Sequence, residues 1–196
     1  MHVVAHVAVS LDGATTGFEP DVGRFYELVA TWSEDVTLAG ADTILAQEAA
    51  LTSAPRPGPA EGGPLLAVVD SRARVSEWKA LREVGHWSDA VALRSSATTD
   101  DVPEIVTGGD RVDLTAALAE LGERYGARTV RVDSGGALTG ALLAAGRLDE
   151  VSLLVHPCLA DGRRWYGTTP PPAKRLTRIA VETFDGDLTW LRYRIG

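Results

Sequence analysis

The feature that most constrains the fold is the stretch of residues 130–155, VRVDSGGALTGALLAAGRLDEVSLLV. Val130 and Val132 end an apolar, β-branched run, which favours a strand. Gly135 and Gly136 form a turn directly after it, apolar residues then recur at helical spacing, and a second apolar run follows. A strand, a crossover helix and a second strand make up the βαβ unit of parallel sheets, so the sequence predicts an α/β protein.

The Gly-Gly turn of this unit has two interpretations. A helix that starts directly after it presents N–H groups and a partial positive charge, which suit a phosphate. Glycine is also common in the turn before any such helix, so a purely structural role is the alternative. The spacing G-x-G-x-x-G is absent, and the turn is therefore not the Rossmann fingerprint.

Composition and charge limit the kinds of partner. Hydrophobic residues make up 45% and charged residues 23% of the chain, and we expect one globular domain over residues 1–196. The net charge of −8 argues against nucleic acid or an anionic membrane as a general partner. No apolar run approaches the ~20 residues of a membrane span, and the N-terminus lacks the basic start of a signal peptide.

The cysteine content points to an intracellular protein without a cysteine-based metal site. Cys158 is the only cysteine, which permits neither an internal disulfide nor a multi-cysteine metal site. A single thiol fits a reducing compartment, so we expect the cytoplasm. We expect no bound metal.

Three further apolar runs lead into polar loops. Residues 3–9 precede Ser10-Leu-Asp-Gly13, residues 36–39 precede Gly40-Ala-Asp-Thr43, and residues 65–69 precede Asp70-Ser-Arg-Ala-Arg74. Loops at the ends of buried strands commonly bind ligands. Thr43 either caps the following helix, which is the default interpretation, or touches a phosphate. The third loop either binds a phosphate, such as the 2′-phosphate that separates NADPH from NADH, or forms a solvated turn.

Single polar residues within the apolar segments have structural interpretations. His6 interrupts the first apolar run, and a lone histidine in such a strand is expected to be structural rather than catalytic. Asp21 and Asp113 each precede an amphipathic pattern and are expected to be N-caps of helices.

The C-terminal part of the sequence predicts a hairpin. Prolines at residues 170–172 end whatever element precedes them. Residues 178–184 and 188–195 then flank an Asp-Gly pair at 185–186, which is a strong hairpin signal. Strands that alternate with helices and close in a hairpin predict a three-layer αβα domain, with a mixed, mostly parallel central sheet and a C-terminal antiparallel hairpin.

Several motifs occur in the same order as in a known family. They are VSLDG at residues 9–13, DVTLAGADTILAQEAALT at 35–52, AVVDSRARV at 67–75, VDSGGALTGALL at 132–143, and the segment 146–162. Together they resemble the reductase domain of the bifunctional riboflavin-biosynthesis deaminase–reductase, over nearly the whole chain. The resemblance implies a dihydrofolate reductase-like fold.

The resemblance also implies an activity and a set of site residues. It implies an NADPH-dependent oxidoreductase that passes a hydride directly to a small heterocyclic substrate, most like 5-amino-6-(5-phosphoribosylamino)uracil reductase. The residues implied to bind the cofactor are Gly40, Ala41, Thr43, Ser71, Arg74, Gly135, Gly136, Ala137 and Leu138. Those implied for the substrate are Ser10, Asp12, Thr16 and Glu48, with Asp133 as the candidate catalytic residue that positions it.

A homodimer is implied as well, because subunits of the family often associate through the sheet edge or the hairpin. Trp165, Tyr166 and Trp190 lie where an exposed apolar patch could form. The deaminase half is missing from this sequence: its zinc signature needs H-x-E and P-C-x-x-C, and no second cysteine follows Cys158.

The sequence departs from the family pattern mainly on the substrate side. Basic residues common in the family are replaced by Ala14, Thr31 and Ala54, and the triplet DDP is replaced by QEA at residues 47–49. Two alternatives therefore stay open: a reductase of the same fold with a different small-molecule substrate, and a nucleotide-binding module without turnover. Residues that could supply the missing charge are Arg24, Arg56, Arg163 and Arg164.

Overall fold

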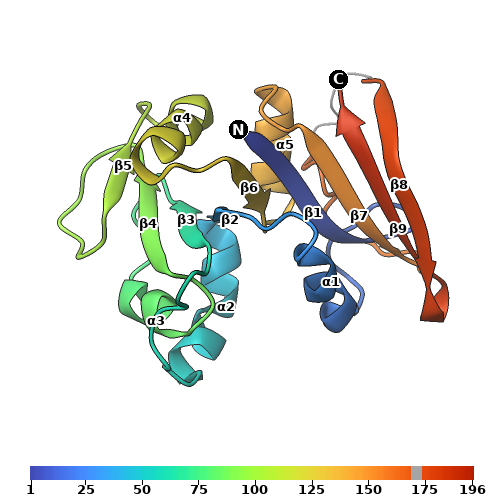
Figure 1. The fold of residues 1–196 in the computed structure, drawn as a ribbon, viewed down its shortest axis with the longest axis horizontal. Helices are drawn as coiled ribbons and strands as arrows, with labels where there is room; N and C mark the ends of the chain where they lie inside the picture. Colours follow the sequence, from blue (N-terminus) through green and yellow to red (C-terminus); the bar gives the residue numbers. More distant parts are fainter. Residues whose placement is uncertain (169–173) are drawn as a thin grey trace. The chain divides into compact units, whose positions relative to one another are not determined.

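The computed structural model describes residues 1–168 and 174–196, so the prolines at residues 170–172 lie outside the described part (Figure 1). The chain divides into two compact units. Unit 1 comprises residue 1 and residues 34–130, and unit 2 comprises residues 2–33 and 131–196. A single domain over residues 1–196 stays a prediction.

Unit 1 contains four parallel strands in the order β5-β4-β3-β2. Their bounds are Val36–Gly40 for β2, Leu65–Val69 for β3, Asp89–Arg94 for β4 and Glu104–Val106 for β5. The register aligns Leu38 with Ala67 and Ala67 with Val91. These strands are almost wholly apolar because helices cover parallel sheets on both faces, which leaves no solvated side for alternating polar residues.

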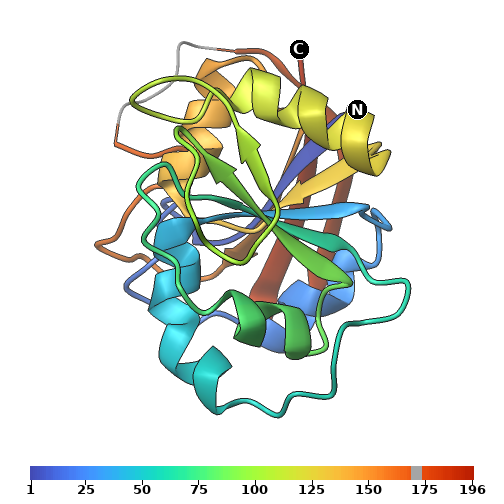
Figure 2. The ribbon, with the colours of Figure 1, turned by 90° about the vertical axis from the view of Figure 1, so that its left-hand side faces the viewer.

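The helices of unit 1 are α2 (Ala41–Ser53), α3 (Trp78–Glu83) and α4 (Leu114–Tyr125). Side chains of α2 and α3, among them Ile44 and Leu81, form one core with Leu66 and Val68 of β3. Helix α4 lies on the side of these strands opposite α3 (Figure 2). Its N-cap is Asp113, as predicted, and the carboxylate accepts hydrogen bonds from the first-turn N–H groups.

Helix α2 already includes Thr43, the residue that the sequence analysis gave as its default cap. It begins directly after β2 and continues to Ser53. A proline within a helix removes a hydrogen bond and clashes with the preceding turn. Where the family motif carries proline this chain has Ala49, which allows the helix to continue.

Unit 2 combines one parallel and two antiparallel strand pairs in the order β1-β7-β9-β8. Their bounds are His2–Ser10 for β1, Glu150–His156 for β7, Leu176–Phe184 for β8 and Leu188–Ile195 for β9. The short strand β6 (Thr129–Val132) spans the division between the units. The predicted α/β class, with mostly parallel strands and a C-terminal antiparallel hairpin, is confirmed.

Helix α1 (Val22–Val29) covers one face of the strands in unit 2. Asp21 is its N-cap, as predicted, and accepts a hydrogen bond from the Arg24 N–H at 2.8 Å. The core beneath α1 includes Trp190, which is only 4% exposed. The prediction that Trp190 belongs to an exposed patch is therefore wrong: its face of β9 turns towards α1 rather than towards solvent.

His6 is structural, as predicted, because a closed chain of hydrogen bonds uses both ring nitrogens. The indole of Trp190 donates to Ser152 Oγ at 2.7 Å, and that hydroxyl lies 2.9 Å from His6 Nδ1. His6 Nε2 lies 3.0 Å from the Phe25 carbonyl oxygen, which can only accept. A neutral ring with its hydrogen on Nε2 fits this pattern, because Ser152 Oγ can donate to Nδ1 while Nε2 donates to the carbonyl. Burial lowers the pKa of His6 to about 4, although the hydrogen bond to the Phe25 carbonyl opposes the shift.

The pKa of His6 predicts a loss of stability in mild acid. The unfolded chain takes up a proton near the ordinary histidine pKa and the folded chain only near pH 4, so the free energy of unfolding falls as the pH drops through that window. The full decrease is about 3 kcal/mol. Urea unfolding of His6→Gln at pH 7, 5 and 4 should show a much smaller decrease. The exposed His86 provides the control: His86→Gln should keep the wild-type decrease.

Candidate functional site

In unit 2, helix α5 (Gly136–Ala144) begins four residues after the end of β6. Its N-cap is Gly135, which provides no side-chain cap. Helix geometry leaves the first-turn N–H groups without intrahelical acceptors, so this end suits an anion. Of the predicted cofactor residues, Gly135 and Ala137 are exposed here, whereas Gly136 and Leu138 are buried.

The two glycines of the turn serve different purposes. A Cβ on Gly135 would meet no atom within 4 Å, so the space beside it is open to a ligand. A Cβ on Gly136 would lie 1.9 Å from the Arg164 carbonyl oxygen, and one on Gly140 would lie 2.2 Å from that of Tyr166. The backbone of residues 164–167 therefore packs directly on α5, which gives Gly136 a packing function that the sequence did not indicate.

This difference predicts unequal effects of two neighbouring substitutions. Gly136→Ala should lower the free energy of unfolding by about 1–3 kcal/mol, because residues 164–167 must move away from α5. Gly135→Ala should change it by less than about 0.5 kcal/mol, because nothing lies where the methyl group would go. Urea denaturation measures both values. Equal losses would contradict the assignment of the close contact to Gly136.

The turn after β1 holds Ser10 and Asp12 in a closed network. The Ser10 hydroxyl donates to Asp12 Oδ1 at 2.7 Å and accepts from the Ala14 N–H at 2.9 Å. The same Asp12 oxygen accepts from the Ala160 N–H at 3.1 Å, and Arg164 Nη1 pairs with Oδ2 at 2.7 Å. The hydrogen bond from Ser10, together with those from the Ala160 N–H and Arg164, holds the pKa of Asp12 well below its usual range.

Residues 163–165 lie along this turn. Thr16 Oγ1 accepts from the Arg163 N–H at 3.2 Å, and the Thr15 N–H donates to the Arg163 carbonyl at 2.7 Å. Two of the four arginines that could replace the missing basic positions are thereby placed beside the predicted substrate residues. The Arg163 side chain is exposed, while Arg164 is paired with Asp12.

Asp133 follows β6 and is the candidate positioning residue. Its Oδ2 lies 3.0 Å from Nη1 of Arg131, whose side chain is buried. The Asp133 side chain is 26% exposed, so part of the carboxylate is open to a ligand. The pairing fixes the direction of this carboxylate.

In unit 1, three of the predicted cofactor residues lie at the start of α2. Gly40 ends β2 and is the N-cap of the helix, Ala41 is the first helical residue and Thr43 the third. The default interpretation of Thr43 as the cap is therefore wrong, because the helix begins earlier than its hydrophobic pattern indicated.

The loop after β3 carries the other two cofactor residues of unit 1. Arg74 Nη2 pairs with Asp42 Oδ1 at 2.7 Å, which brings this loop to the first turn of α2. Ser71 Oγ accepts from the Val112 N–H at 3.0 Å. Its hydroxyl hydrogen still has to be donated, and an oxygen of a bound phosphate is a suitable acceptor.

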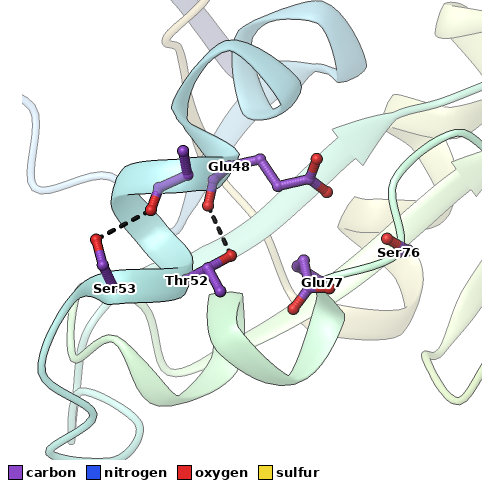
Figure 3. A pocket seen from close by; sticks show the side chains of 6 residues that line it. Glu48, Thr52, Ser53, Ser76 and Glu77 are labelled. Carbon is purple, nitrogen blue, oxygen red and sulfur yellow. Dashed lines mark hydrogen bonds between the residues drawn. The ribbon is translucent and has the colours of Figure 1, made fainter.

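Glu48 lies two turns further along α2, about 10 Å from the helix start by helix geometry. It lines a cavity of about 520 Å³ together with Ala49, Thr52, Ser53, Ser76 and Glu77 (Figure 3). The Thr52 hydroxyl donates to the Glu48 carbonyl at 2.8 Å, so it is not directed into the cavity. Within unit 1, the structure therefore groups Gly40, Ala41, Thr43 and Arg74, and separates Glu48 from them.

Sequence reasoning missed one buried charge in unit 1. Arg94 ends β4 with its side chain 1% exposed, and it pairs with Asp70, Asp100 and Glu104. The sequence carried a signal for it, because an arginine at the end of an apolar strand needs buried partners.

Among the described residues, no cluster of three or more His, Cys, Asp or Glu side chains could hold a metal ion. No helix in the described ranges is long and apolar enough to cross a membrane.

Comparison with known structures supports the class of fold. A pyrimidine reductase-like protein from Corynebacterium diphtheriae superposes with a TM-score of 0.74 at 16% identity, covering 100% of this chain and 92% of its own. The parallel strands of unit 1 and the C-terminal hairpin of unit 2 belong to the dihydrofolate reductase-like class of α/β proteins.

The family follows from the sequence match. The model described as "RibD C-terminal domain" matches residues 1–190, and the chain belongs to this family. Two curated relatives are named 2,5-diamino-6-ribosylamino-4(3H)-pyrimidinone 5′-phosphate reductase. The one from Methanothermobacter thermautotrophicus is 28% identical over 178 residues, 83% of this chain and 80% of its own. The one from Archaeoglobus fulgidus is 29% identical over 186 residues, 83% of each chain.

Proposed function

We propose that the protein is an NADPH-dependent reductase of riboflavin biosynthesis that reduces a ribosylaminopyrimidine 5′-phosphate. The observation that carries the proposal is the family match over residues 1–190, with relatives named as such reductases that align over most of both chains. The substrate is 5-amino-6-(5-phosphoribosylamino)uracil or the diaminopyrimidinone that the relatives' name specifies.

The residues of each unit fit parts of a dinucleotide. In unit 2, the uncapped start of α5 and the open space at Gly135 suit the pyrophosphate, with Gly136, Ala137 and Leu138 supplying N–H groups. In unit 1, Ser71 and Arg74 suit the adenosine 2′-phosphate, and Gly40, Ala41 and Thr43 border the cofactor. NADPH supplies the hydride when bound.

The remaining predicted residues act on the substrate. Asp133 positions it through the exposed part of its carboxylate, and Ser10, Asp12, Thr16 and Glu48 contact it. Ser10 and Asp12 bond to each other, so the turn is rigid before substrate arrives, and a preorganised turn lowers the ordering cost of binding. Arg163 is the exposed cation beside this turn and is the candidate to replace the missing basic residues.

One experiment tests the cofactor and the substrate in turn. Tryptophan fluorescence during titration with NADPH and NADH measures binding, and absorbance at 340 nm with each pyrimidine phosphate measures turnover. Ser71→Glu should weaken NADPH binding at least about tenfold and NADH binding much less, because its carboxylate repels the 2′-phosphate. Ser53→Glu, on the exposed end of α2, is the control and should change neither.

The outcomes separate the alternatives. Binding of NADPH with turnover of neither pyrimidine phosphate would favour a reductase with another small-molecule substrate. Binding without turnover of any reducible heterocycle would favour a nucleotide-binding module. Failure to bind either nucleotide would refute the reductase assignment.

We propose further that the protein is a cytoplasmic homodimer that pairs through β8. This nine-residue strand is the last of the order β1-β7-β9-β8, and its exposed apolar residues Leu176, Ile179 and Val181 are 40–46% exposed. An edge strand with apolar side chains favours pairing with another copy. The single cysteine supports the reducing compartment.

Light scattering after size exclusion tests the dimer. The wild type should have twice the chain mass of 20.8 kDa, and Ile179→Lys/Val181→Lys should have the mass of one chain, because two charges would face the partner. Val106→Lys is the control: Val106 is 46% exposed on β5, and this variant should remain dimeric. A wild-type mass of one chain would refute the dimer.

A further inference from the structure

The most heavily buried charge in unit 1 is Arg94, which lies outside the residues assigned to any ligand. Its side chain is 1% exposed and meets three carboxylates from different segments. Nη1 lies 3.0 Å from Asp70 Oδ2, Nη2 lies 2.5 Å from Asp100 Oδ2, and Nε lies 3.6 Å from Glu104 Oε1. The guanidinium also lies over the Trp78 ring, 5.5 Å from its centre.

Of the three carboxylates, Asp70 is the one that fixes the conformation of the loop after β3. Its Oδ2 accepts from Arg94 and from the Val75 N–H at 2.8 Å, so one carboxylate closes residues 70–75 into a turn. The Ala73 N–H donates to the Asp70 carbonyl at 3.2 Å. Ala73 has a φ of 52°, a conformation that a residue with a Cβ adopts only when its surroundings enforce it.

The same loop carries the two side chains proposed to meet the adenosine 2′-phosphate. Ser71 lies next to Asp70, and Ser95, next to Arg94, donates to the Ser71 carbonyl at 2.9 Å. Arg74 lies directly before Val75, and the Val75 N–H donates a hydrogen bond to the Asp70 carboxylate. Arg94 therefore fixes the backbone on both sides of the phosphate-binding residues without reaching the ligand itself.

Stability alone is a weak reason for such a group. A buried ion pair commonly contributes no more than an apolar pair of the same volume. Within the described residues, two buried atoms of the network each lack a hydrogen-bond partner: Arg94 Nε and Asp70 Oδ1. The hydrogen bonding of the network is therefore incomplete. What an arginine offers and an apolar residue does not is a planar group that holds several carboxylates in fixed directions.

We propose that Arg94 is a positioning residue that determines cofactor specificity, by holding residues 70–75 in the geometry with which Ser71 and Arg74 recognise the 2′-phosphate. The inference rests on the proposed use of NADPH. Loss of Arg94 should then weaken the binding of NADPH and leave the binding of NADH nearly unchanged.

The test compares the two nucleotides in a variant that removes the two fully buried charges of the network. Arg94→Met/Asp70→Asn removes both charges and keeps similar volumes. Titrations followed by tryptophan fluorescence give the Kd of NADPH and of NADH. The ratio of the NADH Kd to the NADPH Kd should fall at least about tenfold relative to the wild type. A folded variant, by circular dichroism, that keeps the wild-type ratio within about twofold would overturn the proposal.

A matched buried pair in unit 2 controls for a general loss of stability. Arg192 Nε pairs with Glu150 Oε1 at 2.7 Å, with side chains 17% and 4% exposed. Arg192→Met/Glu150→Gln should lower the thermal midpoint and leave the ratio of the two Kd values unchanged. An equal fall of the ratio in this control would mean that the ratio reports loosening of the whole protein, and would overturn the proposal.

A milder variant keeps the test decisive if the double variant fails to fold. Asp100 is 37% exposed, so Asp100→Asn removes one of the three ties to Arg94 without leaving a fully buried charge unpaired. The ratio should fall about threefold, and an unchanged ratio would overturn the proposal. If the wild type binds neither nucleotide, the proposed function fails first. If the wild type prefers NADPH and the variants keep the wild-type ratio, only the assignment of Arg94 fails.

Discussion

Backbone packing against α5 is the contact on which the candidate site of unit 2 depends. The carbonyl of Arg164 approaches the helix where a Cβ on residue 136 would stand, so only glycine fits there. The same approach places the Arg164 side chain on Asp12 and the Arg163 backbone on Thr16. A local choice of residue in one helix therefore organises a turn more than 100 positions away in the sequence.

In unit 1 a loop is also fixed in place, but by buried ion pairs rather than by close packing of the backbone. Arg94 gathers carboxylates from the ends of β3 and β5 and from the loop between β4 and β5, and fixes the loop that carries Ser71 and Arg74. In both units a rigid polar arrangement lies at a strand end, where parallel α/β proteins bind their ligands. The rigidity matters chemically, since a reductase depends on holding its reactants in a fixed relative position.

Much of the fold could be predicted from the sequence because it depends on local patterns. The apolar runs gave the strands, Asp21 and Asp113 were correctly predicted as N-caps, and the Asp-Gly pair at 185–186 turns the hairpin. Predictions failed where the same local sequence pattern is compatible with either a buried or an exposed side chain. Whether Trp190 met a core or solvent depended on α1, which lies about 160 residues earlier in the chain.

The sequence by itself determined the order of strands and helices, the glycine-started α5, the hairpin and the likeness to a reductase family. These follow from propensity, periodicity and motif order, which are properties of neighbouring residues. Only the tertiary structure decided which glycine serves packing, which arginine meets Asp12, and that Arg94 holds the loop after β3. Such pairings join residues far apart in the chain, and their geometry is set by strand register and loop path, which no local pattern specifies.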